Sequence, residues 1–188
     1  MPRRPSDALS ETPTEALVSR LTEALRTVPD FPRPGVLFRD ITTIISDPGL
    51  FHEAVDALAI ACGPGRVDTV VGIEARGFVL GGALAYVLGA GFAPIRKQGR
   101  LPAAVESVAY SLEYGEAVLE MHIDAVEAGQ RVVIADDLLA TGGTAAAASE
   151  LVERMGARVS RLVFLIELAD LGGAAHLGGR DHTSILTF

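Results

Sequence analysis

RVVIADDLLATGGT, the stretch from Arg131 to Thr144, joins an apolar run, two adjacent acids and a loop of glycine and threonine. Its apolar run, Val132 to Ala135, predicts a buried parallel strand, because such strands are covered on both faces. Asp136 and Asp137 stand where that strand is expected to end. The Ala-rich run from Ala145 to Met155 predicts a helix after the loop. The stretch therefore predicts a strand–loop–helix unit of an α/β fold.

The loop between the acids and the helix has the composition of a phosphate-binding loop. Its residues are Ala140, Thr141, Gly142, Gly143 and Thr144. Glycines let the backbone approach an anion, and loop N–H groups with a helix N-terminus form an anion cradle. Threonine hydroxyls can donate to phosphate oxygens, and paired carboxylates can accept from vicinal ribose hydroxyls. The pattern indicates a 5-phosphoribosyl ligand; the alternative is a structural strand–turn–helix with an acidic turn and a glycine N-cap.

Two competing phosphate-binding motifs fail in this sequence. No GxxxxGK[ST] pattern occurs, so the chain has no P-loop lysine. The nearest approach to GxGxxG, Gly89-Ala90-Gly91, lacks the third glycine and follows a helical run rather than a strand.

Strands and helices alternate along the middle of the chain. Apolar periodicity predicts helices over 14–28, 48–61 and 77–88, and strands over 67–73, 91–95, 107–112, 116–123, 131–135 and 159–165. This alternation predicts a doubly wound, mainly parallel sheet with flanking helices and with ligands at the carboxyl ends of the strands. We expect a flexible tail over residues 1–13 and one domain from 14 to 188. The segment from Ile185 to Phe188 has the weakest pattern.

Composition excludes several classes of protein. The 188 residues carry a formal net charge of -8, which argues against a nucleic-acid surface. No uninterrupted apolar run is long enough to predict a membrane span. The single cysteine, Cys62, excludes a disulfide framework and fits a reducing cytosol, so we expect a cytoplasmic protein.

Two further polar clusters follow predicted strands, at the expected ligand edge of the sheet. The first is Glu74, Ala75, Arg76 and Gly77, and the second is Arg96, Lys97 and Arg100. An arginine can hold an oxygen-rich anion through two hydrogen bonds, and clustered cations can neutralise a departing anion. The alternatives are a surface Glu–Arg turn pair and a solvated charged face.

Five segments occur in an order that resembles type I phosphoribosyltransferases, and among them the members that act on adenine. They are FPRPGVLFRDIT (31–42), EARGF (74–78), RKQGRLP (96–102), YSLEYG (110–115) and DDLLATGGT (136–144). The resemblance runs from about Thr14 to Leu168. It implies a type I phosphoribosyltransferase fold with a small N-terminal hood and a mobile lid loop. It also implies transfer of the phosphoribosyl group of 5-phosphoribosyl 1-pyrophosphate (PRPP) to adenine, giving AMP and pyrophosphate, by a homodimer that uses Mg²⁺.

The resemblance assigns roles to the residues that match its segments. Asp136, Asp137, Ala140, Thr141, Gly142, Gly143 and Thr144 would bind PRPP; Glu74, Ala75, Arg76, Gly77, Arg96, Lys97 and Arg100 would bind pyrophosphate; Leu37, Phe38, Arg39 and Leu138 would bind adenine. Phe38 and Leu138 would cover the two faces of the purine, although without the resemblance Phe38 is a simple core residue. The C=O of Leu37 and the N–H of Arg39 would complement the amino group and N1 of adenine.

The remaining implied roles concern the lid, the metal and the backbone. Glu113 would handle a proton near N7 or N9 of adenine or support the cationic sugar, and Tyr110 and Tyr114 would belong to the lid. Mg²⁺ would be held mainly by PRPP and water, with no direct protein ligand. Family members often hold a non-proline cis peptide in the loop that corresponds to Glu74–Gly77.

Two departures and two rival functions complete the sequence-based prediction. Arg100 stands where many family members have lysine, and Ala103-Ala104-Val105 lacks the polar residues expected in the lid. The nearer rival is the same reaction with hypoxanthine, guanine or xanthine. The other is a regulator that senses PRPP without catalysis, although such proteins often carry a DNA-binding domain or a basic face.

Overall fold

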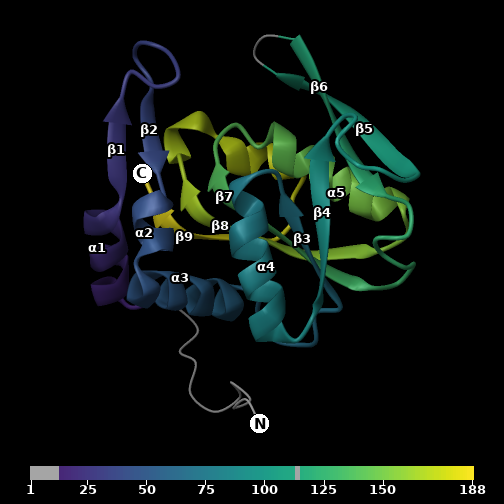
Figure 1. Cartoon of the computed structure of the whole chain (residues 1–188), viewed down its shortest axis with the longest axis horizontal. Coiled ribbons are helices and arrows are strands. Elements are labelled where there is room, and N and C mark those ends of the chain that lie inside the picture. Colours follow the sequence, from purple (N-terminus) through teal and green to yellow (C-terminus); the bar gives the residue numbers. More distant parts are fainter. Residues whose placement is uncertain (1–12, 113–114) are drawn as a thin grey trace.

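A seven-stranded sheet forms the centre of the computed structural model, which describes residues 13–112 and 115–188. The strand order is β5-β6-β4-β3-β7-β8-β9 (Figure 1). The parallel strands are β3 (Thr69–Ile73), β4 (Gly91–Lys97), β7 (Arg131–Leu139), β8 (Arg158–Glu167) and β9 (His182–Thr187). An antiparallel pair, β5 (Val105–Leu112) and β6 (Gly115–His122), extends the sheet beyond β4. The predicted mainly parallel sheet is confirmed.

Helices cover both faces of this sheet, as a doubly wound fold requires. Helices α3 (Pro48–Ala61) and α4 (Arg76–Leu88) belong to one hydrophobic core, and α5 (Gly143–Arg154) belongs to the other. Strand β7 contributes to both cores, because successive side chains of a strand point to opposite faces. Val133 and Ala135 enter the core with α3 and α4, whereas Val132 and Ile134 enter the core with α5.

A small N-terminal unit lies beside the sheet and corresponds to the predicted hood. It consists of α1 (Glu15–Ala24), β1 (Arg26–Pro29), β2 (Leu37–Asp40) and α2 (Thr42–Ser46). Strands β1 and β2 pair with each other in a separate antiparallel sheet (Figure 1). Thr14 caps α1 as predicted, with its hydroxyl oxygen 3.3 Å from the N–H of Leu17 that donates to it. The predicted tail, apart from Pro13, lies outside the described residues.

The predicted helix over 14–28 is wrong at its C-terminal end. Helix α1 ends at Ala24, and Val28 instead lies in β1 opposite Phe38. Thr27 and Val28 are β-branched and favour strands. Pairing with β2 therefore overrides the helical spacing of the apolar residues.

Two element boundaries near the motif also differ from the prediction. Strand β7 continues to Leu139 instead of ending at Ala135, because Leu138 and Leu139 still pair with β8. Helix α5 begins at Gly143, before the predicted Ala145.

Two short 3-10 helices, η1 (Ala169–Leu171) and η2 (Gly173–Leu177), connect β8 to β9. Among the described residues, no helix has both the length and the apolar character needed to cross a membrane.

Candidate functional site

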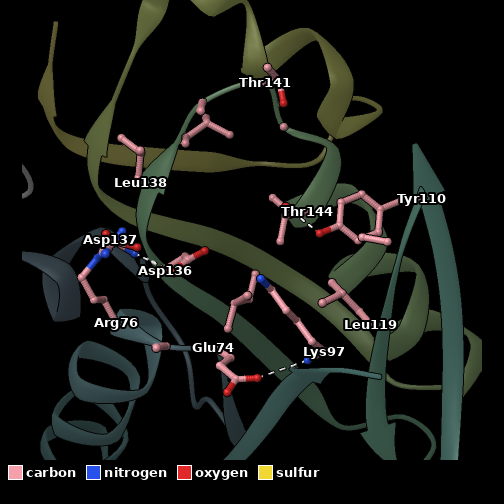
Figure 2. Close-up of a pocket in the computed structure, with 17 residues that line it drawn as sticks. Glu74, Arg76, Lys97, Tyr110, Leu119, Asp136, Asp137, Leu138, Thr141 and Thr144 are labelled. Atoms are coloured by element: carbon pink, nitrogen blue, oxygen red, sulfur yellow. Dashed lines mark hydrogen bonds and ion pairs between the residues drawn. The ribbon is translucent and has the colours of Figure 1, made fainter. Parts of the chain in front are cut away.

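A cavity of about 490 Å³ opens at the carboxyl ends of the parallel strands, where the doubly wound fold is expected to bind ligands. Figure 2 shows its walls, which come from the end of β3, the hairpin β5–β6, and β7 with the loop that follows it. Its lining includes Glu74, Ala75, Arg76, Lys97, Tyr110, Ala117, Leu119, Asp136, Asp137, Leu138, Ala140, Thr141, Gly142 and Thr144. The structure thus brings most of the predicted polar site residues together.

The two acids of the motif point in different directions because they are consecutive residues of β7. The Asp137 carboxylate is buried and accepts a hydrogen bond from Nε of Arg76 at 2.5 Å. Asp136 projects toward the middle of the cavity (Figure 2) and accepts from the backbone N–H of Asp137 at 2.9 Å. Burial is the largest cause, and repulsion from Asp137 the second, of a pKa of Asp136 that is raised well above its ordinary value. The pair therefore offers oxygen acceptors that suit hydroxyl donors.

The loop between β3 and α4 forms the lower wall of the view in Figure 2. Its Glu74–Ala75 bond is a non-proline cis peptide, as the resemblance implies. Glu74 accepts from Nη2 of Arg96 at 2.7 Å and from the backbone N–H of Lys97 at 3.3 Å. The hydrogen bond from Arg96 lowers the pKa of Glu74 below its ordinary value. Glu74 thus connects the two predicted pyrophosphate-binding clusters.

The predicted cations do not all reach the cavity. Lys97 lines it and extends its side chain toward Asp136, as Figure 2 shows. Arg96 and Arg100 do not line it. Arg96 is held by Glu74, and its Nη1 also donates to the C=O of Arg100 at 3.0 Å.

The glycine–threonine loop lies at the N-terminus of α5. Gly142 is the N-cap residue and has a left-handed backbone (φ +83°), which favours glycine. The hydroxyl of Thr144 donates to the phenol oxygen of Tyr110 on β5, at 3.2 Å. Ala140, Thr141 and Gly142 complete this wall, whereas Gly143 does not line the cavity. The arrangement places a helix N-terminus and threonine hydroxyls at one end of the cavity, a geometry that suits a phosphate group.

The predicted base-binding residues lie next to the cavity and are only partly in it. Leu138 lines it, whereas Leu37, Phe38 and Arg39 belong to β2 and do not. Phe38 approaches the site through Arg76, whose guanidinium carbon is 5.2 Å from the centroid of the phenyl ring. Arg39 instead places its guanidinium 4.3 Å from the ring centroid of Phe188.

Beside β2 lies a second, smaller hollow of about 340 Å³, lined by Arg26, Val28, Phe31, Phe38 and Asp40. Phe31 packs edge-on against Phe38, with the ring centroids 5.0 Å apart. Of the predicted lid residues, Tyr110 lies in the cavity wall, but Glu113 and Tyr114 lie outside the described residues.

Comparisons with known proteins agree with this geometry. A family model for the phosphoribosyl transferase domain matches residues 51–175. Adenine phosphoribosyltransferase of Methylobacterium nodulans is 56% identical over 164 residues, which cover 87% of this chain and 91% of the relative. The enzyme of that name from Chelativorans sp. is 52% identical over 176 residues, 93% of this chain and 97% of the relative. This chain belongs to the adenine phosphoribosyltransferase family.

Solved structures of the adenine phosphoribosyltransferase family share the fold. The crystal structure of the Rhodothermus marinus member matches with a TM-score of 0.90 and 47% identity, over 93% of this chain and 100% of that one. The Saccharomyces cerevisiae member, solved in complex with adenine and an imino-altritol bisphosphate, matches with a TM-score of 0.87 and 40% identity, over 92% and 100%. The predicted type I phosphoribosyltransferase fold is thereby confirmed.

Several residues of this family member's cavity were not predicted from its sequence. Ala117 and Leu119 reach the cavity from β6, and Gly173 lies in backbone contact with the glycine–threonine loop. Alternation along β6 is the signal that could have located the first two. The doublet Gly172-Gly173 is visible in the sequence, but it predicts only a turn. In the two described stretches, no group of three or more His, Cys, Asp or Glu side chains could hold a metal ion.

Proposed function

We propose that this protein transfers the 5-phosphoribosyl group of PRPP to adenine, giving AMP and pyrophosphate, and so serves purine salvage. A bond forms between N9 of adenine and C1′ of the ribose, the bond from C1′ to the pyrophosphate oxygen breaks, and the proton on N9 is lost. One observation carries the proposal. The paired acids and the glycine–threonine loop share a cavity with Arg76 and Lys97, so a phosphorylated sugar and its leaving group fit side by side.

The phosphate and sugar contacts follow from the walls of the cavity. The N–H groups of the loop and the hydroxyls of Thr141 and Thr144 would bind the 5′-phosphate. Asp136 and Asp137 would accept hydrogen bonds from the two ribose hydroxyls. These donors would also offset the burial and the repulsion from Asp137 that together raise the pKa of Asp136.

Pyrophosphate would leave toward the wall that carries Glu74–Gly77 and Lys97. Arg76 would exchange its contact with Asp137 for a pyrophosphate oxygen, and Lys97 would bring a second positive charge. Arg96 and Arg100 would act from behind this wall, through the contact of Arg96 with Glu74.

Adenine would lie between the cavity and β2. Phe38 would stack on one face of the purine and Leu138 would cover the other. The C=O of Leu37 and the N–H of Arg39 would pair with the amino group and N1. Hypoxanthine and guanine reverse these donor and acceptor roles, and each mispaired group costs about 1–3 kcal/mol in a desolvated pocket.

Glu113 would complete the site when the lid closes, either by handling the proton of adenine or by supporting the cationic sugar. Closure with Tyr110 and Tyr114 would exclude water, which otherwise hydrolyses PRPP.

The residues present fit an Mg²⁺ ion that arrives with PRPP. PRPP and water would coordinate the ion, and Asp136 and Asp137 would help position it by holding the ribose hydroxyls of PRPP, with no direct protein ligand. The ion would supply neutralisation of the pyrophosphate charge.

We also propose that the protein works in the cytoplasm as a homodimer. The buried thiol of Cys62 suits a reducing compartment. An apolar groove between α3 and α4, flanked by the 85% exposed Tyr86, suits a contact between copies. Light scattering coupled to gel filtration measures the mass directly, and a monomer at micromolar concentration would contradict the dimer.

The test of the main proposal is product formation from PRPP and Mg²⁺ with adenine, hypoxanthine, guanine or orotate supplied separately. We expect AMP from adenine, no nucleotide from the other bases, and a sharp loss of rate in Glu113→Ala. Nucleotide from another base would contradict the adenine assignment. PRPP binding without nucleotide from any base would overturn the enzyme and favour a PRPP sensor.

A further inference from the structure

The glycine–threonine loop packs closely against η2, and the shortest approaches are to main-chain atoms, with the Cβ atom of His176 next to Gly142. A Cβ atom added to Gly142 would lie 2.3 Å from the carbonyl oxygen of Gly173. A Cβ atom added to Gly173 would lie 2.2 Å from the carbonyl oxygen of Ala140. Because these oxygens belong to the backbone, they cannot rotate away as a side chain could. Neither glycine can therefore accept a side chain unless the two backbone segments move apart.

Helix η2 is itself held in place from behind. Leu177 at its end is fully buried in the core that contains α5. Arg180, just after η2, donates from Nη1 to the C=O of Leu177 at 2.9 Å. Its Nε and Nη2 donate to the two carboxylate oxygens of Glu153 on α5, at 2.8 and 2.7 Å. Hydrogen bonds from Arg180 thus connect η2, which packs against the loop, to α5, whose N-terminus forms the end of the same loop.

We propose that η2 acts as a template for the phosphate loop and that Gly173 is a positioning residue for PRPP. The inference rests on the proposed function, in which residues 140–144 bind the 5′-phosphate. A loop that contains two adjacent glycines has many conformations, and ordering it on binding would weaken affinity. The carbonyl of Gly173 against Gly142 removes most of these conformations before the substrate arrives. Gly173 acts through the loop and has no contact with the reacting atoms.

A single methyl group tests this template. Gly173 lies in η2 without a left-handed backbone, so alanine fits its backbone conformation and only its Cβ matters. The distance of 2.2 Å falls about 1.2 Å short of ordinary contact, so Gly173→Ala must push the loop away from η2. A displacement of this size in a positioning group costs about tenfold or more in binding or rate. We expect KM for PRPP to rise by about that factor, with KM for adenine changed less than about twofold.

The matched control is Gly82→Ala, in the middle of α4. A Cβ atom at Gly82 meets nothing within 4 Å, and its backbone is ordinary helix. This variant should keep both KM values of the wild type. If wild type and Gly82→Ala turn over adenine while folded Gly173→Ala keeps the wild-type KM for PRPP, the template is refuted and the proposed function stands. Absence of turnover in all three proteins would instead refute the proposed function.

A second variant covers the case in which Gly173→Ala does not fold. Arg180→Gln removes the fastening of η2 to Glu153 without introducing any clash. We expect a smaller rise in KM for PRPP, about threefold, again with KM for adenine unchanged. A lower melting temperature with an unchanged KM for PRPP would mean that η2 only stabilises the fold, and would refute the template.

Discussion

Removing the Arg76 side chain should destabilise the protein even without substrate. Arg76 pairs with the buried carboxylate of Asp137 at 2.5 Å, and its guanidinium carbon lies 5.2 Å from the centroid of the Phe38 ring. In Arg76→Ala the Asp137 carboxylate loses its cation and still lies beside Asp136. A buried charge left without its partner is costly, because neither water nor an opposite charge compensates it.

The exposure of the two side chains sets the magnitude. The Asp137 side chain is 9% exposed, whereas that of Arg76 is 39% exposed. Breaking a fully buried pair costs about 3–5 kcal/mol, and an exposed pair contributes about 1 kcal/mol or less. With one partner buried and the other partly solvated, we expect a loss of about 2 kcal/mol in the free energy of unfolding. For a chain of this size that is a decrease of about 4–8 °C in melting temperature.

The measurement is urea unfolding at neutral pH, with Arg66→Ala as the matched control. Arg66 also pairs with an aspartate, Asp68, at 3.2 Å, but its side chain is 88% exposed. The control should therefore lose less than about 0.5 kcal/mol. A double-mutant cycle with Arg76→Ala and Asp137→Asn should give a coupling energy of about 1–2 kcal/mol. A coupling near zero, or equal losses in the two arginine variants, would falsify the reasoning.

Three further perturbations have expected outcomes. Burial and repulsion from Asp137 raise the pKa of Asp136 above its ordinary value of 3.8. Between pH 3.8 and the raised pKa, the folded state therefore keeps a proton on Asp136 that the unfolded chain has lost. The contribution of Asp136 to stability is therefore greatest at low pH and falls as pH rises. At neutral pH, Asp136→Asn should raise the free energy of unfolding by about 1 kcal/mol and should lose turnover. Melting curves from acid to neutral pH check this, and a stability difference between variant and wild type that does not change with pH would contradict it. Tyr110→Phe removes the acceptor of the Thr144 hydroxyl, a hydrogen bond worth about 1 kcal/mol, so the free energy of unfolding should fall by about that amount in urea unfolding, and an unchanged value would contradict this. Burial raises the pKa of the Cys62 thiol to about 12, so iodoacetamide should label it only in denaturant, as mass spectrometry would show.

The sequence predicts best where the local pattern and the tertiary structure agree. Val132–Ala135 is apolar on both faces, and the structure places it between two cores. The strand-end loops at Glu74–Gly77 and at Asp136–Thr144 were predicted to meet, because parallel strands present their carboxyl ends at one edge. The cavity confirms that meeting. These predictions needed only periodicity, turn residues and one topological rule.

The failures share one physical cause, which is pairing between distant parts of the chain. Val28 leaves the predicted helix because β2 offers it a strand partner in Phe38. Strand β7 continues past its acids because Leu139 pairs with Glu167 of β8. The contact between Gly142 and Gly173 joins a loop and a 3-10 helix that no local pattern connects. Sequence spacing identifies elements, but it does not show which distant backbone will be available to pair.

The two ion pairs around the cavity have a consequence for substrate recognition. Arg76 is engaged by Asp137 and Arg96 by Glu74, so both arginines have carboxylate partners before substrate binds. On the proposed roles, a pyrophosphate that draws Arg76 away leaves Asp137 buried and unpaired, and the free-energy cost of this weakens binding. Ribose hydroxyls can offset this cost, because they donate hydrogen bonds to the carboxylates that the arginine has left. Pyrophosphate alone should therefore bind much more weakly than PRPP, since only the complete substrate supplies both the anion for Arg76 and the donors for the acids.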